Sequence, residues 1–115
     1  MIFNGYPDLQ AGTDALVLYS PDRTYNFLIK SSEFLLGRGI DVDGRIRGNL
    51  NIGRRHCMIL RGRDGEYYIR DLQSLNGTFL NGQQLEANVD CRLYDGDEIM
   101  LYSQKLILAD RKSVV

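Results

Sequence analysis

The sequence predicts an all-β domain, and three observations support that prediction. The apolar residues occur in short runs of strand length, helical periodicity is almost absent, and Gly, Asp and Asn separate the runs. Turn signals stand between the runs at SPDR (20–23), GRDG (62–65) and YDGD (94–97). Short strands joined by regular turns indicate a sandwich or a barrel, without a helix longer than about two turns.

Seven apolar runs mark the expected strands in chain order. They are ALVLYS (15–20), YNFLIK (25–30), EFLLG (33–37), HCMILRG (56–62), EYYIRD (66–71), GTFLNG (77–82) and DEIMLYSQKLILAD (97–110). Residues 37–53 break this rhythm, because they contain five glycines and no sustained alternation. We predict a long connection there, with one short strand around residues 45–47, and such connections in compact domains are usually functional or mobile.

Two Asn-Gly pairs lie close together in DLQSLNGTFLNG (71–82). An Asn-Gly pair favours the tip of a hairpin, because both residues tolerate the positive φ of a type I′ turn. Only residues 78–80 separate the two pairs, so both cannot be simple hairpin tips. We expect Asn76 and Gly77 in an exposed loop that can present polar groups to a partner, and Asn81 and Gly82 at the tip of the following hairpin.

Length and composition predict one soluble domain. The chain has 115 residues, of which 43% are apolar and 25% charged, a balance that is typical of globular proteins and argues against a membrane span. We expect the domain over 13–110, an N-terminal extension or edge segment over 1–12, and a C-terminal tail over 111–115. The start of the chain shows no secretory signal, which predicts a cytoplasmic location.

The arginines are unevenly distributed. Residues 38–70 contain eight Arg, no Lys and four acids, whereas residues 71–99 contain six acids and one Arg. A guanidinium forms forked hydrogen bonds to phosphate that an ammonium cannot form, although a solvated basic face explains most of these residues equally well. Nucleic acid is not an expected partner, because the net charge is −1 and no platform of basic and aromatic residues is evident.

Catalytic and metal chemistry are poorly supported. His56 is the single histidine, and neither a nucleophile elbow nor an HExxH spacing occurs. Cys57 and Cys91 are widely spaced in apolar runs and are predicted to be buried thiols rather than metal ligands. The acidic turns lack the ligand ladder of a calcium loop. We therefore expect no catalytic residue, no metal and no cofactor.

Four motifs in order resemble the forkhead-associated (FHA) domain: LLGR (35–38), IGRRHCMI (52–59), DLQSLNGTFLNG (71–82) and LYDGDEIML (93–101). The resemblance covers about residues 25–108. It implies a β-sandwich of two mostly antiparallel sheets with about eleven strands, whose loops at one end bind phosphothreonine peptides. Each motif alone is weak, but their joint occurrence in an all-β sequence is specific.

The resemblance also implies roles for individual residues. Arg38 corresponds to the arginine that holds the phosphate, Asn76 to the asparagine that holds the backbone of the bound peptide, and His56 to a scaffold histidine that braces the loops. The remaining matched motif positions are structural: Gly37, Gly77, Thr78, Asn81 and Gly82.

Two departures from the family pattern remove hydroxyl donors. Gly53 stands where the family has a phosphate-binding Ser, and Leu75 stands where many members have Thr or Ser. Each such hydrogen bond to a charged group is worth about 1.5–3 kcal/mol. Three kinds of donor are candidates to compensate: backbone N–H groups near Gly53, the guanidinium of Arg54 or Arg55, and that of Arg45 or Arg47.

The expected function is a non-enzymatic interaction module that recognises a phosphothreonine-containing protein or peptide through Arg38, Asn76 and Arg54 or Arg55. These side chains are expected on one exposed face. The missing hydroxyls at Gly53 and Leu75 keep an alternative open, in which a degenerate domain binds a partner protein, or a second copy of itself, without phosphate. No membrane partner is expected.

Overall fold

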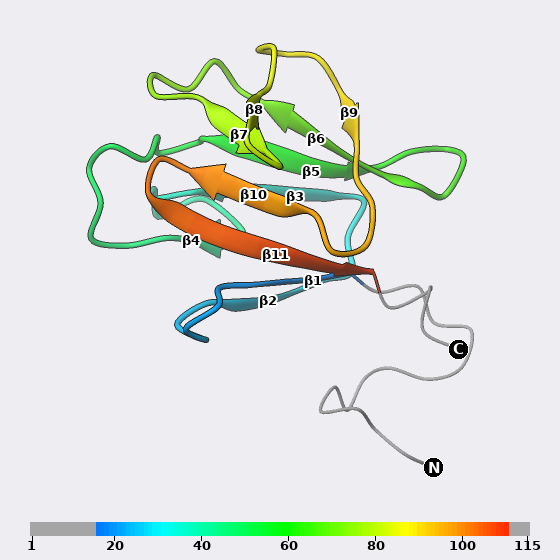
Figure 1. Ribbon diagram of the computed structural model, residues 1–115, viewed down its shortest axis with the longest axis horizontal. Coiled ribbons are helices and arrows are strands. Elements are labelled where there is room, and N and C mark those ends of the chain that lie inside the picture. Colours follow the sequence, from blue (N-terminus) through cyan, green and yellow to red (C-terminus); the bar gives the residue numbers. More distant parts are fainter. Residues whose placement is uncertain (1–15, 111–115) are drawn as a thin grey trace.

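The computed structural model describes residues 16–110, and within that range it contains eleven strands and no helix (Figure 1). The strands are β1 (Leu16–Tyr19), β2 (Asn26–Ile29), β3 (Glu33–Gly37), β4 (Gly44–Arg45), β5 (Cys57–Arg61), β6 (Tyr67–Asp71), β7 (Thr78–Leu80), β8 (Gln83–Gln84), β9 (Cys91–Arg92), β10 (Glu98–Leu101) and β11 (Gln104–Asp110). The predicted all-β sandwich is confirmed. The predicted extension at 1–12 and tail at 111–115 lie outside the described residues. No described helix is long and apolar enough to cross a membrane.

The strands form two sheets that face each other. The six-stranded sheet has the order β2-β1-β11-β10-β7-β8, and the five-stranded sheet has the order β4-β3-β5-β6-β9. Neighbouring strands are antiparallel except for β3 and β4, which are parallel (Figure 1). This arrangement follows from the short turns in the sequence, because a tight turn can join only antiparallel neighbours.

The core lies between the sheets and follows the alternation of the strands. In β5 and β6, for example, Cys57, Ile59, Tyr67 and Ile69 are buried while the residues between them are only half-buried. Within residues 16–110, the fully buried Leu and Ile side chains are Leu16, Leu18, Ile29, Leu36, Ile46, Ile52, Ile59, Ile69, Ile99, Leu101, Leu106 and Leu108. Burying one such side chain stabilises the fold by about 1.5–3 kcal/mol.

The turns that the sequence marks are present. Backbone hydrogen bonds close SPDR between β1 and β2, GRDG between β5 and β6, and YDGD before β10. Asn81 and Gly82 have φ values of 50° and 86°, and they join β7 to β8 with Leu80 opposite Gln83. Two central residues with positive φ are the pattern of the type I′ hairpin turn, for which Asn-Gly is well suited.

Two strand predictions need correction. The short strand expected around 45–47 is β4, Gly44–Arg45, because the N–H of Arg47 bonds the Tyr25 hydroxyl at 2.9 Å instead of a neighbouring strand. The apolar run at 97–110 divides into β10 and β11 at Tyr102 and Ser103. The sequence conceals this second turn because neither residue is a usual turn residue for positive φ.

Tyr102 carries the backbone strain of that turn. Its φ is 53°, and it is the first of the two residues between the paired Leu101 and Gln104, where a type II′ turn favours glycine. The side chain is 47% exposed and contributes little to the core. We expect Tyr102→Gly to raise the free energy of unfolding by about 0.5–1 kcal/mol, since the relief of strain exceeds the entropic cost of glycine. Urea denaturation measures this change, and a loss of stability would contradict the strain argument.

Three loops gather at one end of the sandwich (Figure 1). They are the β3–β4 loop (38–43), the β4–β5 loop (46–56) and the β6–β7 loop (72–77). β1 begins and β11 ends at the other end, where Leu16 and Asp110 are paired. The loops therefore form a surface well away from the points where the chain enters and leaves the described domain.

Candidate functional site

Three arginines line one open cleft among these loops. The cleft has a volume of about 320 Å³ and is lined by Arg38, Gly39, Ile40, Asp41, Arg45 and Arg54. Arg38 directly follows β3, and its Nε donates to the carbonyl of Ile52 at 2.7 Å. Nε of Arg45 donates in turn to the carbonyl of Arg38 at 3.1 Å. Each bond holds a guanidinium by its Nε atom. The outer Nη groups of both arginines have no partner within residues 16–110, and they can therefore bind an anion.

Arg54 and Arg55 have different environments, although they are adjacent in sequence. Arg55 binds Asp41 through Nε at 2.9 Å and also through Nη2. This hydrogen bond lowers the pKa of Asp41, which therefore stays ionised and neutralises Arg55. The guanidinium of Arg54 makes no hydrogen bond or ion pair with the described part of the chain. Of the two residues, Arg54 is the one that lines the cleft and keeps its charge available there.

Asn76 lies at the same end of the sandwich as Arg38. Its Nδ2 donates to the carbonyl of Asn51 at 2.9 Å, and Arg38 binds the carbonyl of the next residue, Ile52. The two side chains thus bond neighbouring peptide groups of the β4–β5 loop. The Oδ1 atom of Asn76 has no partner among residues 16–110 and is able to accept a hydrogen bond from a ligand.

His56 connects two of the loops from within the protein. It is fully buried, its Nδ1 accepts the N–H of Gly53 at 2.9 Å, and its Nε2 lies 2.9 Å from the carbonyl of Gly77. Since Nδ1 must accept and Nε2 must donate, these contacts require the neutral tautomer with the proton on Nε2. Burial lowers the pKa of His56 and favours the same neutral form, although the Gly77 carbonyl and the charge of Asp71 oppose the shift.

Two glycines shape the β4–β5 loop. A Cβ at Gly37 would lie 2.1 Å from the carbonyl oxygen of Arg54, so only glycine lets the loop run against the end of β3. Backbone bonds from Arg38 to Gly53 at 3.0 Å and from Gly39 to Arg54 at 3.1 Å use this close approach. Gly53 itself has no positive φ, and the nearest atom to an added Cβ is 3.4 Å away. A serine therefore fits at position 53.

Asp71 organises the β6–β7 loop and was not singled out from the sequence. It is buried, and its carboxylate accepts the N–H and the hydroxyl of Ser74 at 3.1 and 2.6 Å and the hydroxyl of Thr78 at 2.6 Å. Thr78 is fully buried. The signal was present in DLQS, because an Asp three residues before a Ser is a common local capping pattern.

The β6–β7 loop is less uniformly exposed than predicted. Leu75 is 95% exposed and Asn76 is half-buried, but Gly77 is buried, with a φ of 84° and its carbonyl against His56. The prediction of an exposed loop is therefore wrong for Gly77. Burial there follows from the bond to His56, which draws the peptide group inward.

Arg45 and Arg47 have different positions relative to the cleft. Arg45 lines the cleft, whereas both backbone polar groups of Arg47 contact the hydroxyl of Tyr25 and Arg47 is not among the residues of the cleft. Of these two candidates to replace the missing hydroxyls, Arg45 is placed to do so. The N–H of Gly53 is not available for a ligand, because it donates to His56.

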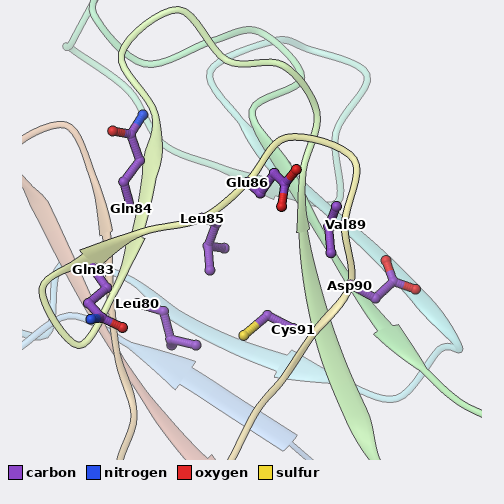
Figure 2. A pocket seen from close by; sticks show the side chains of 8 residues that line it. All are labelled: Leu80, Gln83, Gln84, Leu85, Glu86, Val89, Asp90 and Cys91. Carbon is purple, nitrogen blue, oxygen red and sulfur yellow. The ribbon is translucent and has the colours of Figure 1, made fainter.

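A second hollow lies between the β7–β8 hairpin and β9 (Figure 2). Leu80, Leu85 and Cys91 extend toward its interior, and its volume is about 270 Å³. Cys91 is thus only half-buried, which corrects the prediction that both thiols are buried. Cys57 is fully buried, and burial raises the pKa of its thiol to about 12. Residues 16–110 contain no group of His, Cys, Asp and Glu side chains that could hold a metal ion.

The four motifs and this loop geometry agree with a match to a known family. A family model described as the FHA domain matches residues 34–102. The chain belongs to the FHA domain family. The solved X-ray structure of the N-terminal FHA domain from S. cerevisiae Rad53p, in complex with a phosphothreonine peptide, has the same fold, with a TM-score of 0.76 at 24% identity. That likeness covers 84% of this FHA domain chain and 93% of the Rad53p chain.

Curated relatives of this FHA domain are parts of longer proteins. The chain is 31% identical over 77 residues to the E3 ubiquitin-protein ligase rnf8 of Danio rerio, covering 64% of this chain and 16% of that protein. It is 45% identical over 63 residues to the serine/threonine-protein kinase RAD53 of Saccharomyces cerevisiae, covering 55% of this chain and 8% of that protein. The matching segment is therefore a small part of each relative.

Proposed function

We propose that this FHA domain is a protein-interaction module that binds phosphothreonine-containing proteins. The observation that carries the proposal is the convergence of Arg38, Arg45 and Arg54 on one cleft beside Asn76. A phosphothreonine carries a charge of about −1.5 to −2 and three strong acceptor oxygens at neutral pH. A cleft with three guanidiniums, whose single carboxylate is already paired with Arg55, suits that group in both charge and geometry.

Binding combines electrostatic capture with reading of the peptide backbone. The Nη groups of Arg38 and Arg45 are positioned before the ligand arrives, because backbone carbonyls hold their Nε atoms. Little side-chain freedom is then lost on binding, which favours affinity. The free Oδ1 of Asn76 is available to accept an N–H of the peptide, while its Nδ2 remains on the loop.

A binding role is proposed here in place of an enzymatic one. Both ring nitrogens of the single histidine are used within the fold, which leaves no free imidazole for acid–base chemistry. The ligase and kinase activities named for the two relatives belong to those proteins, of which the match covers only a small part. A cytoplasmic location stays a prediction of the sequence.

A second candidate function is binding of a partner protein, or of a second copy, without phosphate. It is favoured by the absence of a hydroxyl at Gly53 and by Leu75, an apolar side chain that is 95% exposed where many relatives have a hydroxyl. Calorimetric titration with a phosphothreonine peptide library, beside the same peptides without phosphate, separates the two functions. Equal binding of both forms would favour the second function.

Gly53→Ser tests whether the cleft binds phosphate. We expect the added hydroxyl to donate to the phosphate and to tighten phosphothreonine binding by about 1.5–3 kcal/mol. The substitution fits, since the backbone φ is not positive and the closest contact of the new Cβ is 3.4 Å. The unphosphorylated peptide serves as the control and should bind the variant and the wild type alike. If the variant folds normally but gains nothing, the phosphate does not lie beside residue 53.

A further inference from the structure

Among residues 16–110, the three most exposed large apolar side chains are all in the loops around the arginine cleft. Leu75 is 95% exposed, Ile40 is 86% exposed and Leu50 is 83% exposed, each in a different loop. We refer to Ile40, Leu50 and Leu75 as the apolar rim. Single exposed apolar residues are common, but three from separate loops at one end of the fold indicate a surface that a partner covers.

Hydrogen bonds of the loops place the apolar rim beside the candidate site. Leu50 and Leu75 precede Asn51 and Asn76, the two residues that are joined by the bond from Nδ2 to the carbonyl oxygen at 2.9 Å. Ile40 lines the arginine cleft itself. A ligand that reaches both the cleft and Asn76 therefore passes next to these three side chains.

The loops also hold the backbone of the apolar rim in place. The side chain of Asn49 accepts the N–H of Asn51 at 2.9 Å and donates to Ser103 at 3.1 Å, and buried Ile52 anchors the same loop in the core. Leu50 thus projects from a loop that is fixed on both sides. A fixed apolar surface loses little conformational entropy when a ligand packs on it, and it favours apolar over charged ligand side chains.

We propose that the site selects phosphothreonine segments with a large apolar residue near the phosphothreonine, whose side chain packs on Leu50 and Leu75 or on Ile40. This specificity rests on the proposed function. The arginines bind the phosphate group, whereas the apolar rim contacts an apolar side chain that flanks the phosphothreonine. Acidic flanking residues, which the arginines alone would also attract, are disfavoured next to Leu50 and Leu75 because they would lose water without gaining a partner.

The test is a set of phosphothreonine peptides in which each flanking position in turn carries Leu, Ala or Asp. With the wild-type domain, we expect Leu at one or two positions to bind about threefold to tenfold more tightly than Ala, in line with partial burial of a leucine side chain, and Asp to bind no better than Ala. Indifference to the flanking residue within about twofold, or a preference for Asp at every position, would overturn the specificity.

Matched variants identify the surface. Leu50→Ala and Leu75→Ala remove exposed side chains that do not line the arginine cleft, so the fold should persist. At least one of them should abolish the advantage of the Leu peptide while leaving the Ala peptide unaffected. For Ile40→Ala, which alters the lining of the cleft, only the ratio of the Leu and Ala affinities is compared with that of the wild type. Tyr94→Ala is the control, because Tyr94 is 57% exposed in the turn before β10 at the opposite end of the sandwich.

The outcomes distinguish this specificity from the proposed function. If phosphopeptide binding depends on Arg38 but all the rim variants keep the preference for Leu, the apolar rim is not the source of the preference and the proposed function stands. Absence of phosphate-dependent binding would contradict both the specificity of the apolar rim and the proposed function.

Discussion

Replacement of Arg38 by alanine is expected to weaken binding of a phosphothreonine peptide by about 1.5–3 kcal/mol, or roughly tenfold to a hundredfold. The guanidinium supplies charge to the cleft, and its bond to the carbonyl of Ile52 fixes the β4–β5 loop, so the substitution removes both. Arg38→Lys should bind with intermediate affinity, because an ammonium keeps the charge but cannot hold the carbonyl and the phosphate in one planar fork. Calorimetric titration of each variant measures these losses.

The control for Arg38 is Arg63→Ala. Arg63 is exposed in the turn between β5 and β6, at the end of the sandwich that lies away from the loops, so its removal changes the net charge equally without touching the cleft. Equal losses for both variants would mean that binding responds only to net charge. Unchanged affinity of the Arg38→Ala domain for its natural partner, with and without phosphate, would replace the phosphothreonine function by the phosphate-independent one.

Replacement of His56 by alanine is expected to lower the free energy of unfolding by about 2–4 kcal/mol. The substitution leaves the N–H of Gly53 and the carbonyl of Gly77 without their partner inside the fold, and each unsatisfied buried group costs about 1–3 kcal/mol. Urea denaturation of the wild type and the variant measures the difference. A variant as stable as the wild type would show that the two loops do not depend on the histidine.

The same residue predicts a pH dependence of stability. Burial lowers the pKa of His56 in the folded protein below its ordinary value of 6.5, so the unfolded chain takes up a proton first as the pH falls. The stability due to neutral His56 is therefore complete above pH 6.5 and is lost progressively below it. The carboxylates with lowered pKa values, such as Asp41, begin to lose their stabilising contribution only at more acidic pH. The His56→Ala variant is the control, because it should lack the change that begins below pH 6.5.

Most of the strands could be predicted because local patterns specify them. The three-residue strand between the two Asn-Gly pairs is β7, Thr78–Leu80, as the spacing of the pairs requires. The turn at Tyr102 could not be predicted, because its positive φ is imposed by pairing of Leu101 with Gln104 rather than by a residue that prefers it. β4 ends earlier than expected for a similar reason, since the backbone of Arg47 pairs with the hydroxyl of Tyr25, which lies far away in the sequence.

The candidate site could be predicted only in part. The motifs predicted Arg38, Asn76 and His56 as residues of the site. They did not predict that Arg38 and Asn76 donate hydrogen bonds to two adjacent carbonyls of the β4–β5 loop. The sequence also left Arg54 and Arg55 equivalent, and Arg45 and Arg47 as well. The ion pair between Arg55 and Asp41 distinguishes Arg55 from Arg54, whose charge remains available. A partner that lies fourteen positions away in the chain, as Asp41 does from Arg55, leaves no local signal.

The amino-acid pattern thus specifies the β class, the turns with their own chemistry, and the motif residues of the FHA family, because each depends on neighbours within a few positions. Membership of the arginine cleft depends instead on which loops meet when the sheets pack. Gly37 illustrates the difference: its requirement for glycine comes from the carbonyl of Arg54, seventeen positions later, which lies 2.1 Å from where a Cβ would be. The apolar rim likewise exists only because three loops, distant in the chain, meet at one end of the sandwich.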